Sequence, residues 1–219
     1  MAVKWSRQDY KNRFLKFHYF FRSKYRIILT RLFFAAVLVI FCLGRNALAR
    51  QTPVLSEVLF LFGATLVGIG VIGRAWSLSY IAGAKNKTLI VKGPYSLCRH
   101  PLYLFSFIGA LGISFCTETL TVPAIILVCF ALYYPFAIKK EELKMAARFG
   151  REYESYAETV PIFFPSLRTF HEEEMRLINS KSFFRGLTSL IYFIVIIGLF
   201  ELIESMQSLG LFASCYIIY

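Results

Sequence analysis

The strongest constraint on this sequence comes from five apolar runs that contain almost no charged residues. They cover about residues 27–44, 54–73, 102–116, 119–138 and 186–200. A bilayer core takes roughly 20 mostly apolar residues per helix, so runs of this kind are typical of membrane-spanning helices. The composition agrees, because 57% of the 219 residues are hydrophobic and only 17% are charged. We therefore predict an all-α, polytopic membrane bundle of about five transmembrane helices.

Positive charges alternate between the two sides of these runs. Residues 1–31, 74–99 and 139–185 together hold 23 Lys and Arg, whereas the other connections hold only Arg45 and Arg50. Cytoplasmic segments carry the excess of Lys and Arg, so the N-terminus should be cytoplasmic and the C-terminus should lie outside. We expect a bacterial inner membrane, or the endoplasmic reticulum if the source is eukaryotic. The formal net charge of +12 predicts anionic membrane lipids as partners rather than nucleic acid.

Two local patterns favour an ordinary structural role over the chemistry they suggest. Residues 68–73 satisfy G-x-G-x-x-G, but the dinucleotide fingerprint requires a strand before it and a βαβ unit around it. Because these glycines lie inside an apolar run, we interpret them as a surface for close helix packing. His171 is followed by three glutamates without a second His at ligand spacing, which indicates a solvated charge cluster. We predict no metal.

The first group of residues suited to chemistry lies directly before the run at 102–116. Arg99 and His100 stand at the predicted membrane edge, and Pro101 suits the first turn of a helix, where no N–H is required. The start of that helix offers free backbone amides and a positive dipole end. Such a helix start is suited to a carboxylate or a phosphate.

A second polar group, Glu141 and Glu142, follows the run at 119–138. Adjacent carboxylates at the end of a span are costly to bury, so they should face water or meet a cationic partner. The runs at 102–116 and 119–138 form a predicted helical hairpin, which returns the chain to the membrane face where it entered. Both polar groups should therefore converge on one cytoplasmic pocket, open to a water-soluble cofactor and to a lipidic acceptor.

These two groups belong to a longer pattern that spans about residues 80–167. It consists of Gly93-Pro94-Tyr95, Arg99-His100-Pro101-Leu102-Tyr103, the hairpin, Glu141-Glu142, Phe149-Gly150, Tyr153, Tyr156 and Pro165. The pattern resembles the membrane methyltransferases of the isoprenylcysteine carboxyl methyltransferase family and the related phospholipid N-methyltransferases. The resemblance implies that the chain binds S-adenosylmethionine (SAM) on the cytoplasmic side without a Rossmann domain. It further implies methyl transfer to a lipidic or hydrophobic acceptor.

The resemblance also implies which residues bind the cofactor. Carried over by position, they are Lys87, Thr88, Leu89, Ile90, Tyr95, Arg99, His100, Pro101, Leu102, Tyr103, Glu141 and Glu142. This set is chemically reasonable, because the sulfonium and ammonium of SAM suit carboxylates, and its own carboxylate suits Arg99 or the helix end. No catalytic residue is assigned, since an in-line methyl transfer chiefly requires alignment and exclusion of water.

The acceptor is left open by the sequence. In the prenylcysteine enzymes an Arg just before the Glu pair serves the substrate, but Ala137 stands at that position here. Lys139 and Lys140 lie nearby, and we predict that they contact the substrate. The acceptor group could be a carboxylate, a lipid phosphate, an amine or a thiol. The alternatives are an NADPH-dependent enzyme similar to steroid reductases, which the Glu pair disfavours, and a non-enzymatic lipid-binding membrane protein.

The predicted organisation has four segments. Residues 1–26 form a basic amphipathic N-terminal segment, and residues 27–82 hold the first two transmembrane helices. Residues 83–170 form the methyltransferase core, with two motifs that flank the hairpin. Residues 171–219 contain a linker, the fifth transmembrane helix and a tail.

Overall fold

The computed structural model describes residues 44–46, 51–82, 88–172, 178–209 and 216–218. Within them the structure is a helical bundle of α4 (Pro53–Ile81), α6 (Pro101–Phe115), α7 (Thr121–Phe149) and α9 (Ser180–Ser208). The shorter elements are α5 (Pro94–Leu97), α8 (Arg151–Thr159), the 3-10 helix η1 (Leu167–Thr169), and the three-residue strands β1 (Gly44–Asn46) and β2 (Tyr216–Ile218). The predicted all-α class is confirmed. The predicted N-terminal segment and the run at 27–43 lie outside the described residues.

Three of these helices, α4, α7 and α9, are long and apolar enough to cross a membrane. Each has 29 residues, or about 43 Å at a rise of roughly 1.5 Å per residue, whereas a bilayer core is about 30 Å thick. The helices expose large apolar side chains outward, such as Ile72 (71% exposed), Leu132 (66%) and Ile194 (66%). Outward-facing side chains of this kind suit contact with lipid tails. The shorter α6 is apolar as well and has 15 residues.

Helices α4 and α6 pack closely because glycines face each other between them. A Cβ added to Gly70 would lie 2.7 Å from the Cα of Gly109, and one added to Gly112 would lie 2.6 Å from the amide nitrogen of Val67. The interpretation of residues 68–73 as a packing surface is therefore confirmed for Gly70, and also for Gly73, where an added Cβ would lie 2.0 Å from the ring of Phe105. No atom of the described residues lies within 4 Å of a Cβ added to Gly68. Small residues at such positions let two helix backbones approach.

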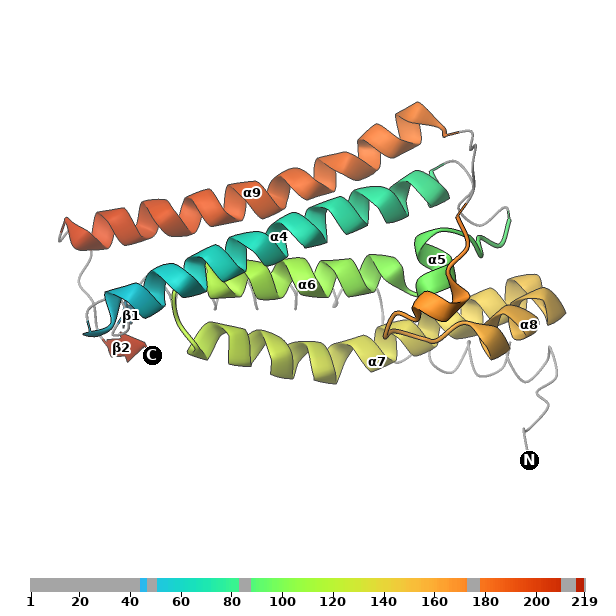
Figure 1. Cartoon of the computed structure of the whole chain (residues 1–219), viewed down its shortest axis with the longest axis horizontal. Coiled ribbons are helices and arrows are strands. Elements are labelled where there is room, and N and C mark those ends of the chain that lie inside the picture. Colours follow the sequence, from blue (N-terminus) through green and yellow to red (C-terminus); the bar gives the residue numbers. More distant parts are fainter. Residues whose placement is uncertain (1–43, 47–50, 83–87, 173–177, 210–215, 219) are drawn as a thin grey trace.

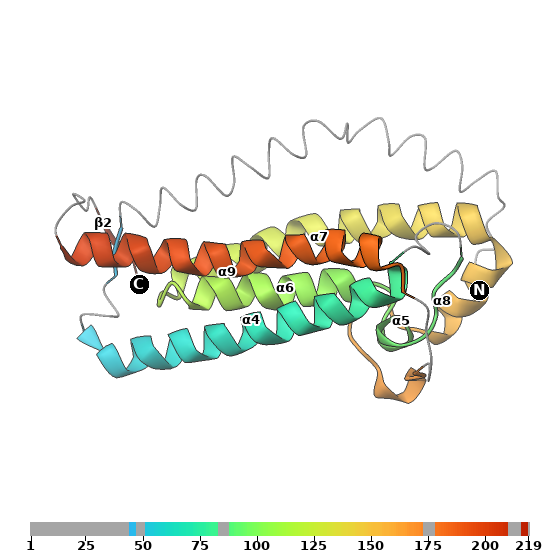
Figure 2. The ribbon, with the colours of Figure 1, turned by 90° about the horizontal axis from the view of Figure 1, so that it is seen from above.

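The four bundle helices run alternately from one end of the bundle to the other (Figures 1 and 2). The last turn of α4, the first turn of α6, the second half of α7 and the start of α9 therefore share one end with α5, α8 and η1. We call this the motif end, because it carries the residues of both predicted polar groups. At the opposite end β1 pairs with β2 in parallel, with Gly44 opposite Tyr216 and Asn46 opposite Ile218.

Candidate functional site

The chain makes a sharp turn at Gly93, at the start of the segment that leads into α6. This residue has a φ of +60°, and a Cβ on it would lie 2.1 Å from the ring of Tyr80, so glycine is required for both reasons. The turn leads through α5 to His100, which is the N-cap of α6, and Pro101 occupies the first turn as predicted.

Residues 161–171, which we call the strap, pack against the segment from Gly93 to Arg99. Its backbone is bonded to the α5 segment at Gly93 N to His171 O (2.6 Å), Ser166 N to Leu97 O (2.9 Å) and Arg99 N to Pro161 O (2.9 Å). Helix α8 adds a bond from the Tyr156 hydroxyl to the carbonyl of Tyr95, at 2.6 Å. The α5 segment is therefore fixed by residues that follow it by about 60 positions or more in the chain.

The carboxylate of Glu142 joins the two predicted polar groups. Its Oε2 lies 2.6 Å from Arg99 Nη1, its Oε1 lies 2.7 Å from His100 Nε2, and Tyr153 donates a hydrogen bond to Oε1. The side chains of Arg99 and Glu142 are only 10% and 21% exposed. The prediction that the Glu pair meets a cationic partner thus holds for Glu142, and the network locks the start of α6 to α7 and α8.

Glu141 points elsewhere, because neighbouring residues on an α-helix differ by about 100° in direction. Its side chain lines a pocket and is 36% exposed, with Lys144 one turn along the helix at 3.9 Å. An exposed pair at that distance contributes little to stability. The two glutamates therefore differ in role: Glu142 is bound within the protein, and Glu141 is available to a ligand.

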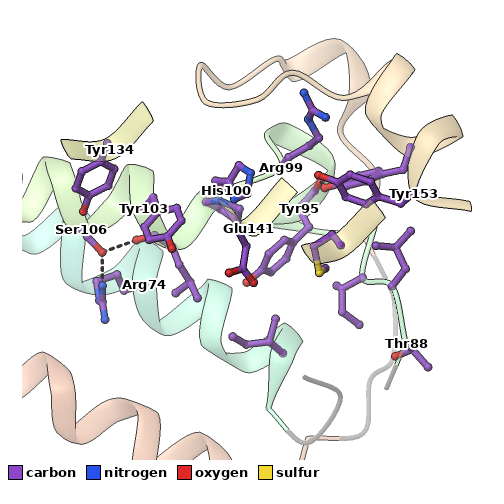
Figure 3. A pocket seen from close by; sticks show the side chains of 17 residues that line it. Arg74, Thr88, Tyr95, Arg99, His100, Tyr103, Ser106, Tyr134, Glu141 and Tyr153 are labelled. Carbon is purple, nitrogen blue, oxygen red and sulfur yellow. Dashed lines mark hydrogen bonds between the residues drawn. The ribbon is translucent and has the colours of Figure 1, made fainter. Parts of the chain in front are cut away.

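The pocket at the motif end has a volume of about 400 Å³, within the roughly 300–1,000 Å³ typical of ligand and cofactor sites. Of the residues implied for the cofactor, ten line it: Thr88, Leu89, Ile90, Tyr95, Arg99, His100, Pro101, Leu102, Tyr103 and Glu141 (Figure 3). Glu142 stands behind them, and Lys87 lies outside the described residues. Neither Lys139 nor Lys140 lines the pocket, so their predicted contact with a substrate has no support from their position.

Seven other residues line the pocket: Arg74, Ile81, Ser106, Tyr134, Met145, Tyr153 and Tyr156. Tyr153 and Tyr156 were part of the motif but were not predicted to lie at the site. Arg74 was missed, although it is the first charge after the run at 54–73, and an ionisable residue at the end of a span is a signal of a functional site. Nothing in the sequence pairs it with Ser106 and Tyr134, which lie on two other helices.

Burial keeps the tyrosine and cysteine side chains around α5 and α8 uncharged. Burial, followed by the hydrogen bond to Glu142, raises the pKa of the Tyr153 phenol well above its usual range. Burial likewise raises the pKa of Tyr95 and Tyr156, and it raises that of the Cys98 thiol to about 11. The tyrosines therefore act as hydrogen-bond donors and aromatic surfaces, and the charges nearby come from Arg99, Glu142 and Glu141.

Comparison with known proteins identifies the family to which the sequence belongs. The phospholipid methyltransferase family matches residues 58–152, which include Arg74, both polar groups and the hairpin. The nickel-cobalt-cadmium resistance protein NccN of Alcaligenes xylosoxydans xylosoxydans is 35% identical over 174 residues, 80% of each chain. The cobalt-zinc-cadmium resistance protein CzcN of Cupriavidus metallidurans is 39% identical over 150 residues, 68% of each chain.

No solved structure matches the chain. The family match agrees with the predicted resemblance, and its range includes all residues that line the pocket except Tyr153 and Tyr156. The chain therefore belongs to the phospholipid methyltransferase family, among the membrane proteins that are similar to isoprenylcysteine carboxyl methyltransferase.

Proposed function

We propose that this membrane methyltransferase uses SAM and methylates a lipidic or hydrophobic acceptor at the cytoplasmic face of a membrane. The observation that carries the proposal is the pocket at the motif end, in which Glu141 and several aromatic side chains meet within the segment that matches the family. Its position supports access for both reactants. Side chains of α4, α6 and α7 line it, and so do side chains of α5, α8 and residues 88–90.

The side chains that line the pocket fit the chemistry of SAM. The Glu141 carboxylate suits a cationic ammonium or sulfonium group, and it is not held by the Glu142 network. The rings of Tyr95, Tyr103 and Tyr153 add electron-rich faces, which attract cations within about 6 Å. When bound, SAM would supply a sulfonium-activated methyl group, whose carbon an acceptor lone pair would attack in line as the bond to sulfur breaks and a neutral thioether leaves.

The residues of the chain contribute alignment and exclusion of water. Glu142 holds Arg99, His100 and Tyr153 in place, so the first turn of α6 and the aromatic wall of the pocket keep a fixed geometry. Tyr153 and Tyr156 are buried, and together with Leu89 and Met145 they close the extramembrane side. A dry site keeps water from competing with the acceptor.

The proposed orientation follows the positive charges. Segments with 23 of the 25 Lys and Arg alternate with segments that hold two, and the residues of the motif end belong to the basic segments. This distribution supports a multi-pass protein with its pocket on the cytoplasmic side. In a bacterium that side belongs to the inner membrane.

The names of the relatives suggest where such an activity matters. NccN and CzcN are named as resistance proteins for nickel, cobalt, zinc or cadmium. By analogy, we propose that this chain contributes to metal tolerance by methylating a membrane component. Tolerance should therefore require an intact methyl-transfer site. A deletion strain complemented with Glu141→Gln should then grow on these metals less well than one complemented with the wild type.

Two measurements on the purified protein test the proposal. Calorimetry should detect SAM binding to the wild type, with affinity reduced in Glu141→Gln and His100→Ala. The exposed Glu154 on α8 provides a matched control, and Glu154→Gln should bind SAM like the wild type.

Incubation with methyl-labelled SAM and a total lipid extract of the host should place label in a lipid, and release of that label as methanol by mild base would identify a carboxyl ester. A wild type that binds no SAM would refute the proposal.

A further inference from the structure

A cationic side chain that the sequence motif does not contain lies at the membrane side of the pocket. Arg74, near the pocket end of α4, is partly buried and donates a hydrogen bond to the Ser106 hydroxyl on α6. Tyr134 of α7 faces the same serine (Figure 3). Three bundle helices therefore each supply one polar side chain to a single spot, surrounded by otherwise apolar helix surfaces.

These three residues lie apart from the residues that suit the cofactor. In Figure 3, Arg74, Ser106 and Tyr134 are at one end of the pocket, whereas Thr88 and Tyr153 are at the other. His100, Tyr103 and Glu141 lie between the two ends, so both ends belong to one continuous pocket. The Arg74 end is formed by bundle helices, and a hydrophobic molecule would arrive from that side.

The Arg74 end is built to bind an oxyanion. A guanidinium offers several N–H donors in a fixed planar fork that matches a carboxylate or a phosphate. The Ser106 hydroxyl accepts a hydrogen bond from Arg74 and donates its own proton to the carbonyl of Leu102, so it orients the guanidinium. The C-terminal helix supports this arrangement, because the Phe193 ring of α9 lies 5.8 Å from the guanidinium carbon of Arg74. A ring at this distance holds the guanidinium by a cation–π contact.

We propose that Arg74, Ser106 and Tyr134 form the head-group site of the methyl acceptor, and that the acceptor is an amphiphile with a carboxylate or phosphate oxyanion. This inference rests on the proposed methyltransferase function and adds the chemical class of the substrate. It also gives the pocket the anion-binding residue that is absent at Ala137. If the bound oxyanion is itself methylated, a new O–C bond forms as the S–C bond of SAM breaks. One negative charge of the oxyanion and the positive charge of the sulfonium then disappear together, and no general base is required.

Binding of three amphiphiles with the same alkyl chain tests the head-group site. The full chain, purified in dodecyl maltoside, is titrated by calorimetry with dodecanoate, dodecyl phosphate and dodecylamine. The wild type should bind one or both anions and should not bind the amine, and the preferred anion identifies carboxylate or phosphate. Arg74→Gln should weaken anion binding roughly ten- to a hundredfold, as expected for loss of hydrogen bonds from a charged donor.

Matched variants separate the site from general charge effects. Arg168→Gln removes an exposed positive charge of η1 that does not line the pocket, and it should bind the anions like the wild type. Arg74→Lys keeps the charge without the planar fork and should give an intermediate affinity. If Arg74→Gln does not fold, Ser106→Ala and Tyr134→Phe provide the same test with smaller expected losses.

The result that overturns the inference differs from the one that overturns the methyltransferase proposal. Anion affinity that is equal in the wild type and Arg74→Gln, preference for the amine, or absence of anion binding would each reject the head-group site while SAM binding stood. A loss of SAM affinity in Arg74→Gln as large as the loss of anion affinity would assign Arg74 to the carboxylate of the cofactor and reject the inference as well. Failure of the wild type to bind SAM would instead refute the proposed function.

Discussion

At the scale of single residues, the site depends on two adjacent glutamates that do different work. Glu142 balances Arg99, contacts His100 and accepts a hydrogen bond from Tyr153, so its charge is part of the folded structure. Among the described residues, the charged partner of Glu141 is Lys144 at 3.9 Å, and Glu141 lines the pocket. The same chemical change at these two positions should therefore have opposite consequences for stability and for ligand binding.

Glutamine substitutions test this division. Glu142→Gln should lower the free energy of unfolding by about 1–3 kcal/mol, because Arg99 then loses its charged partner in a mostly buried setting. Glu141→Gln should leave thermal unfolding nearly unchanged but weaken SAM binding roughly tenfold, through loss of one charge-assisted contact. Thermal unfolding in detergent and calorimetry with SAM measure the two effects. Equal loss of stability in both variants would contradict the division.

At the scale of elements, the contact between α4 and α6 sets the positions of Arg74 and Ser106. Gly70 lies one turn before Arg74 and meets the backbone of Gly109, with no flexible side chain between them that could give way. Gly68 is on the same helix, but a Cβ added there would have no atom within 4 Å in the part of the chain that the structure describes. The two glycines provide a matched pair, since both gain helix propensity on substitution and only one faces a neighbour.

Alanine at these two positions should therefore act in opposite directions. Gly70→Ala should destabilise the protein by about 1–3 kcal/mol, because the added methyl group overlaps the α6 backbone and separates the helices. Gly68→Ala should be neutral or should stabilise by up to about 1 kcal/mol. Thermal unfolding of both variants in the same detergent makes the comparison. A Gly70→Ala protein as stable as Gly68→Ala would show that this helix contact tolerates the added methyl group.

The sequence predicted those elements whose formation is local. Apolar runs gave α4, α6, α7 and α9, because a backbone in lipid must satisfy its own hydrogen bonds within a helix. The motif likewise located Arg99, His100 and Glu141 at one pocket, with Glu142 bound to Arg99 and His100 behind them. The sequence did not predict the rotation of each helix about its own axis, and this rotation decides that Glu142 rather than Glu141 contacts Arg99. For the same reason Arg74, Ser106 and Tyr134 could not be placed together, since their meeting depends on how three helices pack.

At the scale of the whole molecule, the alternating direction of the four helices separates the two ends chemically. The pocket, α8 and the strap lie at the motif end, and the β1–β2 pair lies at the other. A water-soluble cofactor can reach only the end that faces its compartment. The distribution of positive charges and the proposed use of SAM therefore predict the same orientation, with the motif end on the cytoplasmic side, and the two arguments are independent.

Cysteine labelling of the two ends tests this orientation. Arg168→Cys introduces an exposed thiol on η1 at the motif end, and Gln51→Cys introduces one beside the start of α4 at the opposite end. A membrane-impermeant maleimide applied to bacterial spheroplasts should label Gln51→Cys, and it should label Arg168→Cys only after the membrane is permeabilised. Wild-type protein corrects for the native cysteines, of which Cys98 reacts slowly because burial raises the pKa of its thiol to about 11. Labelling of Arg168→Cys in intact spheroplasts would put the pocket on the outer face, where SAM from the cytoplasm could not reach it.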